Sequence, residues 1–289
     1  MQTRALGTTG LRVSEIGLGA GPLGGSELDD RAAIELVHAA LELGISLIDT
    51  APSYGRSELR IGAALRGRRE RVVLSTKLGY AVPGVPDWTG PCITAGIDLA
   101  LDRMGTTWLD IAHLHSCPLD VLERGEVLDA LEAAVRAGKV RAAAYSGDNR
   151  ELAWAIDSGR FAVVQCSVNL ADQRALDAAI PRAIERGVGV LAKRSLANAA
   201  WRDASQPGAP DRAEYWRRMR EMNLPPHGEP AAHALGFVLA QSGISSALLG
   251  TTSLANLAAA VATGALDARS AQTARDAFRR CDRGWDGVI

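Results

Sequence analysis

The chain has few cysteines, no long apolar run and almost no excess of charge. Its 4 cysteines are scattered without a C-x-x-C pair, which is typical of neither a disulfide framework nor a zinc site, so we interpret them as free thiols. No stretch approaches the ~18 uninterrupted apolar residues of a transmembrane helix. The start, MQTRALGTTGLRV, lacks the apolar core of a signal peptide. We therefore expect a cytoplasmic protein with no membrane partner.

Charge is nearly balanced along the chain. The 32 basic and 33 acidic residues leave a formal charge of -1, and only the short stretch from Arg66 to Arg71 concentrates one sign. A nucleic-acid-binding protein needs a basic face, and a protein that binds anionic lipid needs a basic cluster. The composition therefore argues against both partners and leaves a small molecule as the expected ligand.

The periodicity predicts one α/β domain over residues 1–289. β-Branched and apolar runs alternate with Ala-, Leu-, Arg- and Glu-rich stretches of helical period, a pattern typical of βαβ units with parallel strands. Eight such units predict a closed (β/α)₈ TIM barrel rather than an open doubly wound sheet. The expected strands are Val13–Gly19, Ser46–Thr50, Val72–Lys77, Leu109–His115, Val140–Ser146, Val163–Asn169, Gly189–Arg194 and Ser246–Gly250. The expected helices are Asp30–Leu43, Ser57–Leu65, Ile93–Met104, Arg124–Ala137, Arg150–Ser158, Leu176–Glu185 and Ala231–Gln241.

Three segments are longer than a minimal barrel requires. Tyr80–Pro91 and Ala197–Pro230 follow strands, so they are expected to be lids or specificity loops at the rim where barrels bind ligands. Trp88 and Trp201 in these loops either line the substrate pocket or pack the loops onto the barrel. The third segment, Ala265–Ile289, is expected to add a last helix near that rim.

Four chemically related side chains fall at or just beyond strand ends. They are Asp49 and Tyr54 in SLIDTAPSYG, Lys77 in VVLSTKLG and His115 in LDIAHLHSCP. A tyrosine hydroxyl has a reference pKa of about 10, so a protein that uses one as a proton donor near neutrality needs a cation to stabilise the anion. Lys77 can be that cation, held by Asp49, while His115 hydrogen-bonds a substrate oxygen. The pattern predicts a site that reduces a carbonyl.

The flanking sequences resemble the signature segments of the aldo-keto reductase family. GISLIDTAPSYG, LSTKLG, LDIAHLHSCP and GKVRAAAYSG match in order and spacing, and LGTTGLRVSEIGLGAGPLGG is similar to the family's N-terminal hairpin and first barrel strand. The resemblance spans essentially the whole chain. It implies a barrel with an N-terminal hairpin and an extra C-terminal helix. It also implies that Tyr54 is the general acid, assisted by Lys77 and Asp49, and that His115 orients the carbonyl.

The resemblance further implies a nicotinamide cofactor bound without a G-x-G-x-x-G turn. Ser146 and Gln165 match the residues that hold the nicotinamide amide, and Gly19 and Ala20 match the small residues beside the ring. The segments expected to hold the phosphates and the adenosine are Arg194, Ser195, Leu196, Ala197 and Asn198 after the seventh strand, and Gly250, Thr251, Thr252 and Asn256 after the eighth.

Two departures from the family pattern concern the nicotinamide end. Gly147 stands where the family usually has asparagine, with Asp148 and Asn149 following. Lys193 stands where the family often has an aromatic residue that stacks on the nicotinamide. Either the Lys193 ammonium turns toward a phosphate or a carboxylate, or Arg194 offers its flat guanidinium instead.

A third departure concerns the choice of cofactor. In GTTSLANLAAAVA no Lys or Arg is present to grip a 2'-phosphate, and Ala259 and Ala260 replace residues that elsewhere hold adenine. NADP is the expectation from the family, and NAD remains possible.

Two other functions are weighed against this one. His113 and His115 form an H-x-H pair of the kind that begins some binuclear metal sites, but few histidines remain elsewhere to complete one, so a metal-dependent hydrolase is disfavoured and no metal ligand is assigned. An interior role for His113 is preferred. The other alternative is a barrel that binds cofactor as a regulatory subunit with little turnover. The physiological carbonyl or alcohol substrate and the oligomeric state stay open.

Overall fold

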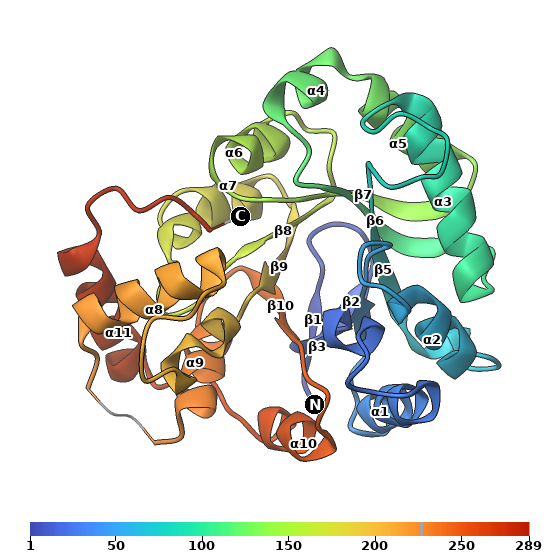
Figure 1. The fold of residues 1–289 in the computed structure, drawn as a ribbon. Helices are drawn as coiled ribbons and strands as arrows, with labels where there is room; N and C mark the ends of the chain where they lie inside the picture. The colour runs from blue at the N-terminus through green and yellow to red at the C-terminus, as the bar shows by residue number, and fades with distance from the viewer. Residues whose placement is uncertain (226–227, 289) are drawn as a thin grey trace.

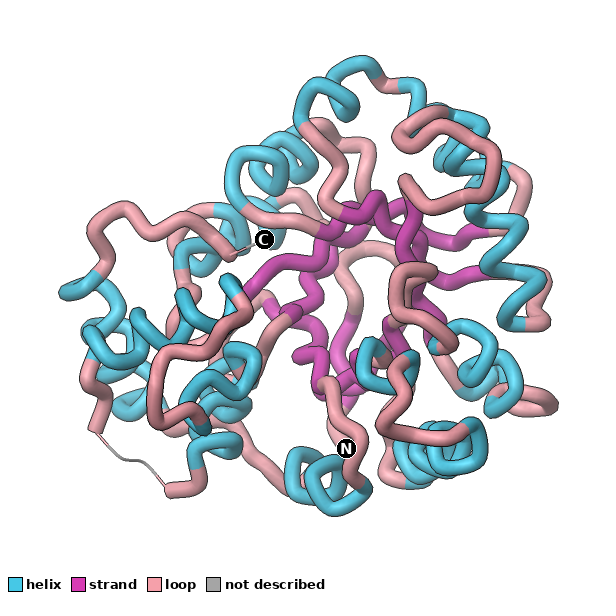
Figure 2. The backbone as a smooth tube through the Cα atoms, in the orientation of Figure 1, coloured by secondary structure: helices cyan, strands magenta, loops and turns pink. Residues whose placement is uncertain are grey.

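The computed structural model describes residues 1–225 and 228–288, and it confirms the (β/α)₈ barrel (Figure 1). Eight parallel strands close in the order β10-β3-β4-β5-β6-β7-β8-β9. Figure 2 shows these strands at the centre of a ring of helices. The barrel strands are β3 (Ile16–Gly19), β4 (Leu47–Asp49), β5 (Val73–Leu78), β6 (Leu109–His115), β7 (Val140–Ser146), β8 (Val163–Ser167), β9 (Gly189–Lys193) and β10 (Ile244–Leu249).

An antiparallel hairpin precedes the barrel, as the resemblance implied. It consists of β1 (Thr3–Ala5) and β2 (Arg12–Ser14), so the single strand predicted over Val13–Gly19 is wrong. The Ser14 hydroxyl donates to the Ile16 carbonyl at 2.6 Å, and the chain leaves the hairpin there to begin β3. Leu6 and Val13 are fully buried against the first residues of the barrel strands, among them Leu47, so the hairpin covers the end of the barrel opposite the rim.

The predicted helices are confirmed to within a few residues, and a short helix that was not predicted precedes one of them. The segment predicted as Arg124–Ala137 is α5 (Glu126–Arg136), preceded by a separate short helix α4 (Leu119–Arg124), because Gly125 adopts a φ of 81° between them. The other helices that follow barrel strands are α1 (Asp30–Glu42), α2 (Ser57–Ala64), α3 (Gly90–Met104), α6 (Asn149–Asp157), α7 (Ala179–Glu185), α9 (Pro230–Leu239) and α10 (Leu254–Val261).

The segment Ala197–Pro230, expected to be a long loop, is largely helical where it is described. A 3₁₀ turn over Ala197–Arg202 leads to α8 (Pro210–Met222), whereas residues 226–227 lie outside the described residues. Met222 packs with Phe278 and Trp285 of the C-terminal segment. That segment contains the predicted last helix, α11 (Ala268–Cys281), which Figure 1 shows beside α8. The expected lid is therefore anchored to the tail.

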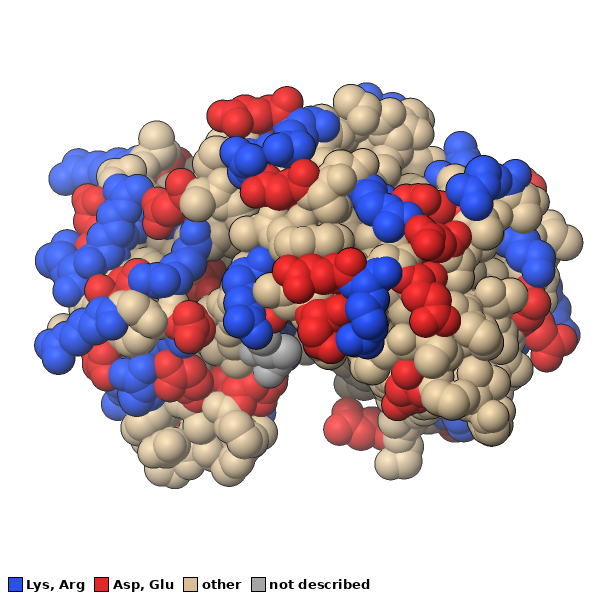
Figure 3. All heavy atoms as spheres, turned by 90° about the horizontal axis from the view of Figure 1, so that it is seen from above, with Lys and Arg blue, Asp and Glu red and all other residues tan. Residues whose placement is uncertain are grey.

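The surface carries mixed charge. In the view of Figure 3, basic and acidic side chains lie interspersed, with many arginines on the side of α8 and α11. No helix in the described part of the chain has both the length and the apolarity needed to cross a bilayer.

Candidate active site

Three of the predicted residues lie on neighbouring barrel strands. Asp49 ends β4, Lys77 is the penultimate residue of β5, and His115 ends β6, while Tyr54 lies in the loop after β4. Because β4, β5 and β6 are adjacent and parallel, their carboxyl ends meet at the same rim. The structure therefore places all four side chains around one cavity of about 450 Å³.

Lys77 and Asp49 form a buried ion pair. The Lys77 ammonium donates to Asp49 Oδ2 at 2.6 Å and to the main-chain carbonyl of Thr50 at 2.8 Å. The other carboxylate oxygen of Asp49 accepts a hydrogen bond from Ser75 Oγ at 2.7 Å. Only 1% of the Lys77 side chain is exposed, so the charge is held by these partners rather than by water.

Each member of this pair keeps the other charged. Burial raises the pKa of a carboxyl and is the largest single effect on Asp49, but the Lys77 ammonium, His113 and the Ser75 hydroxyl together outweigh it, so the pKa of Asp49 is lowered. Burial likewise opposes the charge on Lys77, yet the Asp49 carboxylate and the Tyr54 side chain raise the pKa of Lys77. The rim therefore contains a permanent cation next to a phenol.

The Tyr54 ring lies near both this cation and His115. Lys77 Nζ is 4.9 Å from the centre of the Tyr54 ring, and the ring meets the His115 imidazole edge to face at 6.3 Å. Burial, followed by the charges of Lys77 and Lys193, lowers the pKa of His115 to about 3. The imidazole is neutral near pH 7, so it can donate a hydrogen bond without carrying charge.

His113 has an interior role, as preferred from the sequence. It is fully buried on β6 and contacts Ser75 Oγ at 3.0 Å through Nε2, so it supports the hydroxyl that holds Asp49. Among the residues that the structure describes, no cluster of three or more His, Cys, Asp or Glu side chains could hold a metal ion.

Ser146, the last residue of β7, lies beside Gln165 in the middle of β8. The Ser146 hydroxyl donates to Gln165 Oε1 at 3.0 Å, and both residues line the same cavity as Tyr54. Gln165 Nε2 is buried and has no hydrogen-bond partner among the described residues. A buried unpaired amide is costly, so this donor fits a ligand acceptor such as a carboxamide oxygen.

Lys193 turns its ammonium toward a carboxylate, which selects between the alternatives left open by the sequence. Its Nζ lies 2.9 Å from Asp148 Oδ2, while the amide of Ser167 donates to Asp148 Oδ1 at 2.7 Å.

The glycine at position 147 is explained by packing, because a Cβ there would lie 2.3 Å from the Tyr145 hydroxyl. Asparagine is therefore excluded from position 147 unless Tyr145 moves.

The remaining predicted cofactor residues divide between two adjoining cavities. Gly19, Arg194, Ser195, Leu196 and Asn198 line the cavity with Tyr54. Thr251, Thr252 and Asn256 line a neighbouring cavity of about 890 Å³, and Gly250 and Leu196 border both. Ala20 and Ala197 are fully buried and line neither cavity.

The loop after β9 has an unusual backbone. Four of its non-glycine residues have positive φ angles: Arg194 (54°), Ala197 (45°), Asn198 (52°) and Ala199 (54°). Such angles cost free energy in L-residues and gather at functional sites. This loop joins the two cavities, because Leu196 and Ala199 line both of them.

Comparison with known proteins shows which family the chain resembles. The family model described as "Aldo/keto reductase family" matches residues 15–277. The chain belongs to the aldo/keto reductase family. It is similar to L-galactose dehydrogenase of Arabidopsis thaliana, with 31% identity over 212 residues that span 68% of this chain and 66% of that protein.

Other members of the aldo/keto reductase family match this chain over more of their own length. The NADH-specific methylglyoxal reductase of Escherichia coli is 26% identical over 293 residues, covering 87% of this chain and 90% of that protein. The structure of an aldo-keto reductase from Bacillus halodurans in its holo form superposes with a TM-score of 0.83 at 26% identity, covering 96% of both chains.

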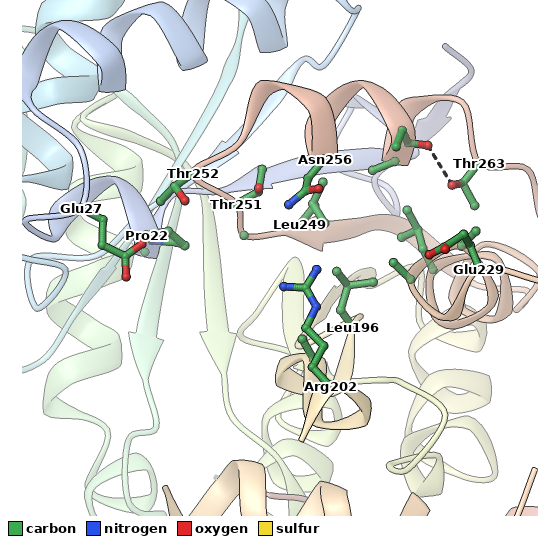
Figure 4. Close-up of a pocket in the computed structure, with 18 of the residues that line it drawn as sticks. Pro22, Glu27, Leu196, Arg202, Glu229, Leu249, Thr251, Thr252, Asn256 and Thr263 are labelled. Atoms are coloured by element: carbon green, nitrogen blue, oxygen red, sulfur yellow. Dashed lines mark hydrogen bonds between the residues drawn. The ribbon is translucent and has the colours of Figure 1, made fainter. Parts of the chain in front are cut away.

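Two residues at the rim of this family member were not found by sequence reasoning. Tyr80 places its hydroxyl 2.6 Å from His115 Nδ1. Arg202 lines the larger cavity together with Leu196 and Asn256, and Figure 4 shows its guanidinium pointing toward the side that holds Asn256. Both lie in segments predicted to be rim loops, but neither has a motif, because the contacts depend on how the loops fold back.

Proposed function

We propose that this protein is an NAD(P)-dependent oxidoreductase that interconverts an aldehyde or ketone and its alcohol. The observation that carries the proposal is that the buried Asp49–Lys77 pair and a neutral His115 both lie next to the ring of Tyr54. The cation stabilises the phenolate that forms when Tyr54 gives its proton to the substrate oxygen. His115 donates a hydrogen bond to the same oxygen. In alcohol oxidation the same groups act in reverse.

The nicotinamide cofactor, when bound, supplies the hydride. Ser146 and Gln165 would hold its amide, and the unpaired Gln165 Nε2 supports this assignment. The loop after β9 and the start of α10 would hold the phosphates, because backbone N–H groups at a loop and a helix start favour anions. Lys193 is engaged with Asp148, so it contributes charge near the site rather than a stacking surface.

We propose NADP as the preferred cofactor, with NAD as the alternative, and Arg202 as the residue that decides between them. Arg202 is exposed and is the cation in the larger cavity that has no ion pair among the described residues, since Arg212 is held by Asp203 at 2.6 Å. Glu27 and Glu229 line the same cavity toward its two sides (Figure 4) and would oppose a dianion. The 2'-phosphate is therefore expected to bind beside Arg202.

Fluorescence titration with NADPH and NADH tests the choice of cofactor. Arg202→Ala should weaken NADPH binding about tenfold and leave NADH binding unchanged, since one charge-assisted contact is lost. Arg220→Ala is a matched control, because this exposed arginine of α8 does not line the cavity. Equal loss for both cofactors, or none for NADPH, would contradict the role of Arg202.

The reaction is tested with the same protein. A panel of aldehydes and ketones is added to the reduced complex, and oxidation of the cofactor is followed. Tyr54→Phe should lower turnover by about 10²- to 10⁴-fold while cofactor affinity stays within a factor of two. Full activity in Tyr54→Phe would refute the assignment. Cofactor binding without turnover over the whole panel would favour the regulatory barrel instead.

A further inference from the structure

The loop that follows β5 brings a second tyrosine to the active site. The Tyr80 hydroxyl lies 2.6 Å from Nδ1 of His115, and the two rings stack with their centres 5.5 Å apart and their planes 24° from parallel. Resting on the proposed function of the site, we propose that Tyr80 is a positioning residue: its hydroxyl donates to His115 Nδ1 and thereby keeps the imidazole proton on Nε2, ready to donate to the substrate oxygen.

The direction of this hydrogen bond follows from the charge state of His115. A neutral imidazole has one N–H and one acceptor nitrogen, whereas a phenol is a good donor and a poor acceptor. Burial and the cations Lys77 and Lys193 keep the imidazole neutral, and Asp49 opposes them only in part. The arrangement with Tyr80 as donor therefore leaves the hydrogen on Nε2. The opposite tautomer would present a lone pair to the carbonyl oxygen and repel it.

The loop is built to hold Tyr80 in this place. Trp88 packs against the Tyr80 ring, with ring centres 5.8 Å apart and planes at 62°, and its amide donates to the Gly79 carbonyl at 2.7 Å. Gly79 has a φ of 129°, and a Cβ there would lie 2.1 Å from the Trp88 ring. The Ala81 amide is held by Asp87 Oδ1 at 3.0 Å. Contacts within residues 79–88 thus hold the loop together and keep the Tyr80 ring stacked on His115.

The Tyr80 hydroxyl also lies near a second hydroxyl, that of Ser53. Ser53, which is exposed, lies 3.4 Å from the Tyr80 oxygen through its Oγ. The phenol has one hydrogen, so Ser53 and His115 compete for it, and the 2.6 Å contact with His115 is much shorter than the 3.4 Å contact with Ser53.

The tautomer is measured directly by ¹⁵N NMR of protein labelled at the histidine nitrogens, recorded at pH 7 without cofactor or substrate. His115 is assigned by the loss of its signals in His115→Gln. In the native protein we expect a neutral ring with hydrogen on Nε2 and a hydrogen-bonded Nδ1. In Tyr80→Phe both shifts should move toward the values of a tautomer mixture. Tyr145→Phe removes a buried hydroxyl bonded to the Cys117 carbonyl instead, and it should leave the His115 shifts unchanged.

Two results would overturn the proposal. One is a native His115 with hydrogen on Nδ1; the other is a Tyr80→Phe protein whose His115 shifts equal those of the native protein. Circular dichroism and thermal unfolding establish that the variants are folded, and a second variant, Tyr80→Leu, should show the same loss of tautomer preference if the hydroxyl is the cause.

Kinetics separate this proposal from the proposed function. Tyr80→Phe should lower kcat/KM for carbonyl reduction about three- to tenfold, as expected for one neutral hydrogen bond, and leave NADPH affinity unchanged. Tyr54→Phe should lose far more activity but keep the native His115 tautomer. If no carbonyl is reduced by the native protein, the proposed function fails, whereas the spectrum still decides the tautomer.

Discussion

Replacing Lys77 by methionine should damage stability and catalysis in ways that can be measured separately. The substitution keeps most of the side-chain volume but leaves the Asp49 carboxylate, 3% exposed, with the Ser75 hydroxyl and without its cation. Removing one partner of a buried ion pair costs about 3–5 kcal/mol of unfolding free energy. Loss of the cation beside Tyr54 should also lower kcat by about 10²- to 10⁴-fold.

The double variant Asp49→Asn/Lys77→Met separates the two effects. It removes both charges, so it should be more stable than Lys77→Met by about 2 kcal/mol or more, because no unpaired carboxylate remains buried. It should be as inactive as the single variant, since the phenol still lacks a cation. Urea unfolding at pH 7 gives the stabilities, and single-turnover reduction at saturating cofactor gives the rates.

The pH dependence provides a further check on the Lys77→Met variant. In the native protein the pKa of Asp49 is lowered, so the pair stabilises the fold above the pKa of the unfolded carboxyl and is lost in acid. Without Lys77, burial raises this pKa, and the variant should recover stability as the pH falls from 7 toward 5. Equal stability of the single and double variants, or a Lys77→Met kcat within threefold of the native value, would refute the reasoning.

The remaining predictions concern residues beside the site. Burial, followed by the Asp148 carboxylate, raises the pKa of Asp172 to about 7 from 3.8, so the folded state retains the proton and stability falls as the pH rises through this window. Between pH 5.5 and pH 8 the unfolding free energy of the native protein should therefore fall by about 2 kcal/mol more than that of Asp172→Asn. Urea unfolding at both pH values measures the two changes, and equal changes would contradict the raised pKa. Gly147→Asn should destabilise the protein by about 1–3 kcal/mol because its Cβ meets the hydroxyl and ring carbons of Tyr145. The cost should shrink in a Tyr145→Leu background, and an unchanged thermal midpoint for Gly147→Asn would show that Tyr145 yields freely.

Local patterns account for the parts of the fold that were predicted correctly. The strands Leu109–His115 and Val140–Ser146 were predicted to the residue, because turn-forming residues such as Gly138, Gly147 and Pro118 lie just outside them. The break between the hairpin and the first barrel strand was missed, because Val13–Gly19 reads as one continuous run in the sequence, whereas the break depends on tertiary hydrogen bonds such as those between Ser14 and Ser46. Likewise, α8 was not predicted, because this helix is stabilised by packing against the distant C-terminal segment.

The sequence by itself determined the barrel, the family resemblance and the four side chains at the rim, because parallel strands place their carboxyl ends together whatever the loops do. The tertiary structure alone decided that Lys193 pairs with Asp148, that Arg202 lines the same cavity as Asn256, and that Tyr80 contacts His115. These residues come from segments far apart in the sequence. Their placement depends on how the loops turn and on how aromatic rings pack, and the periodicity of the sequence does not predict either.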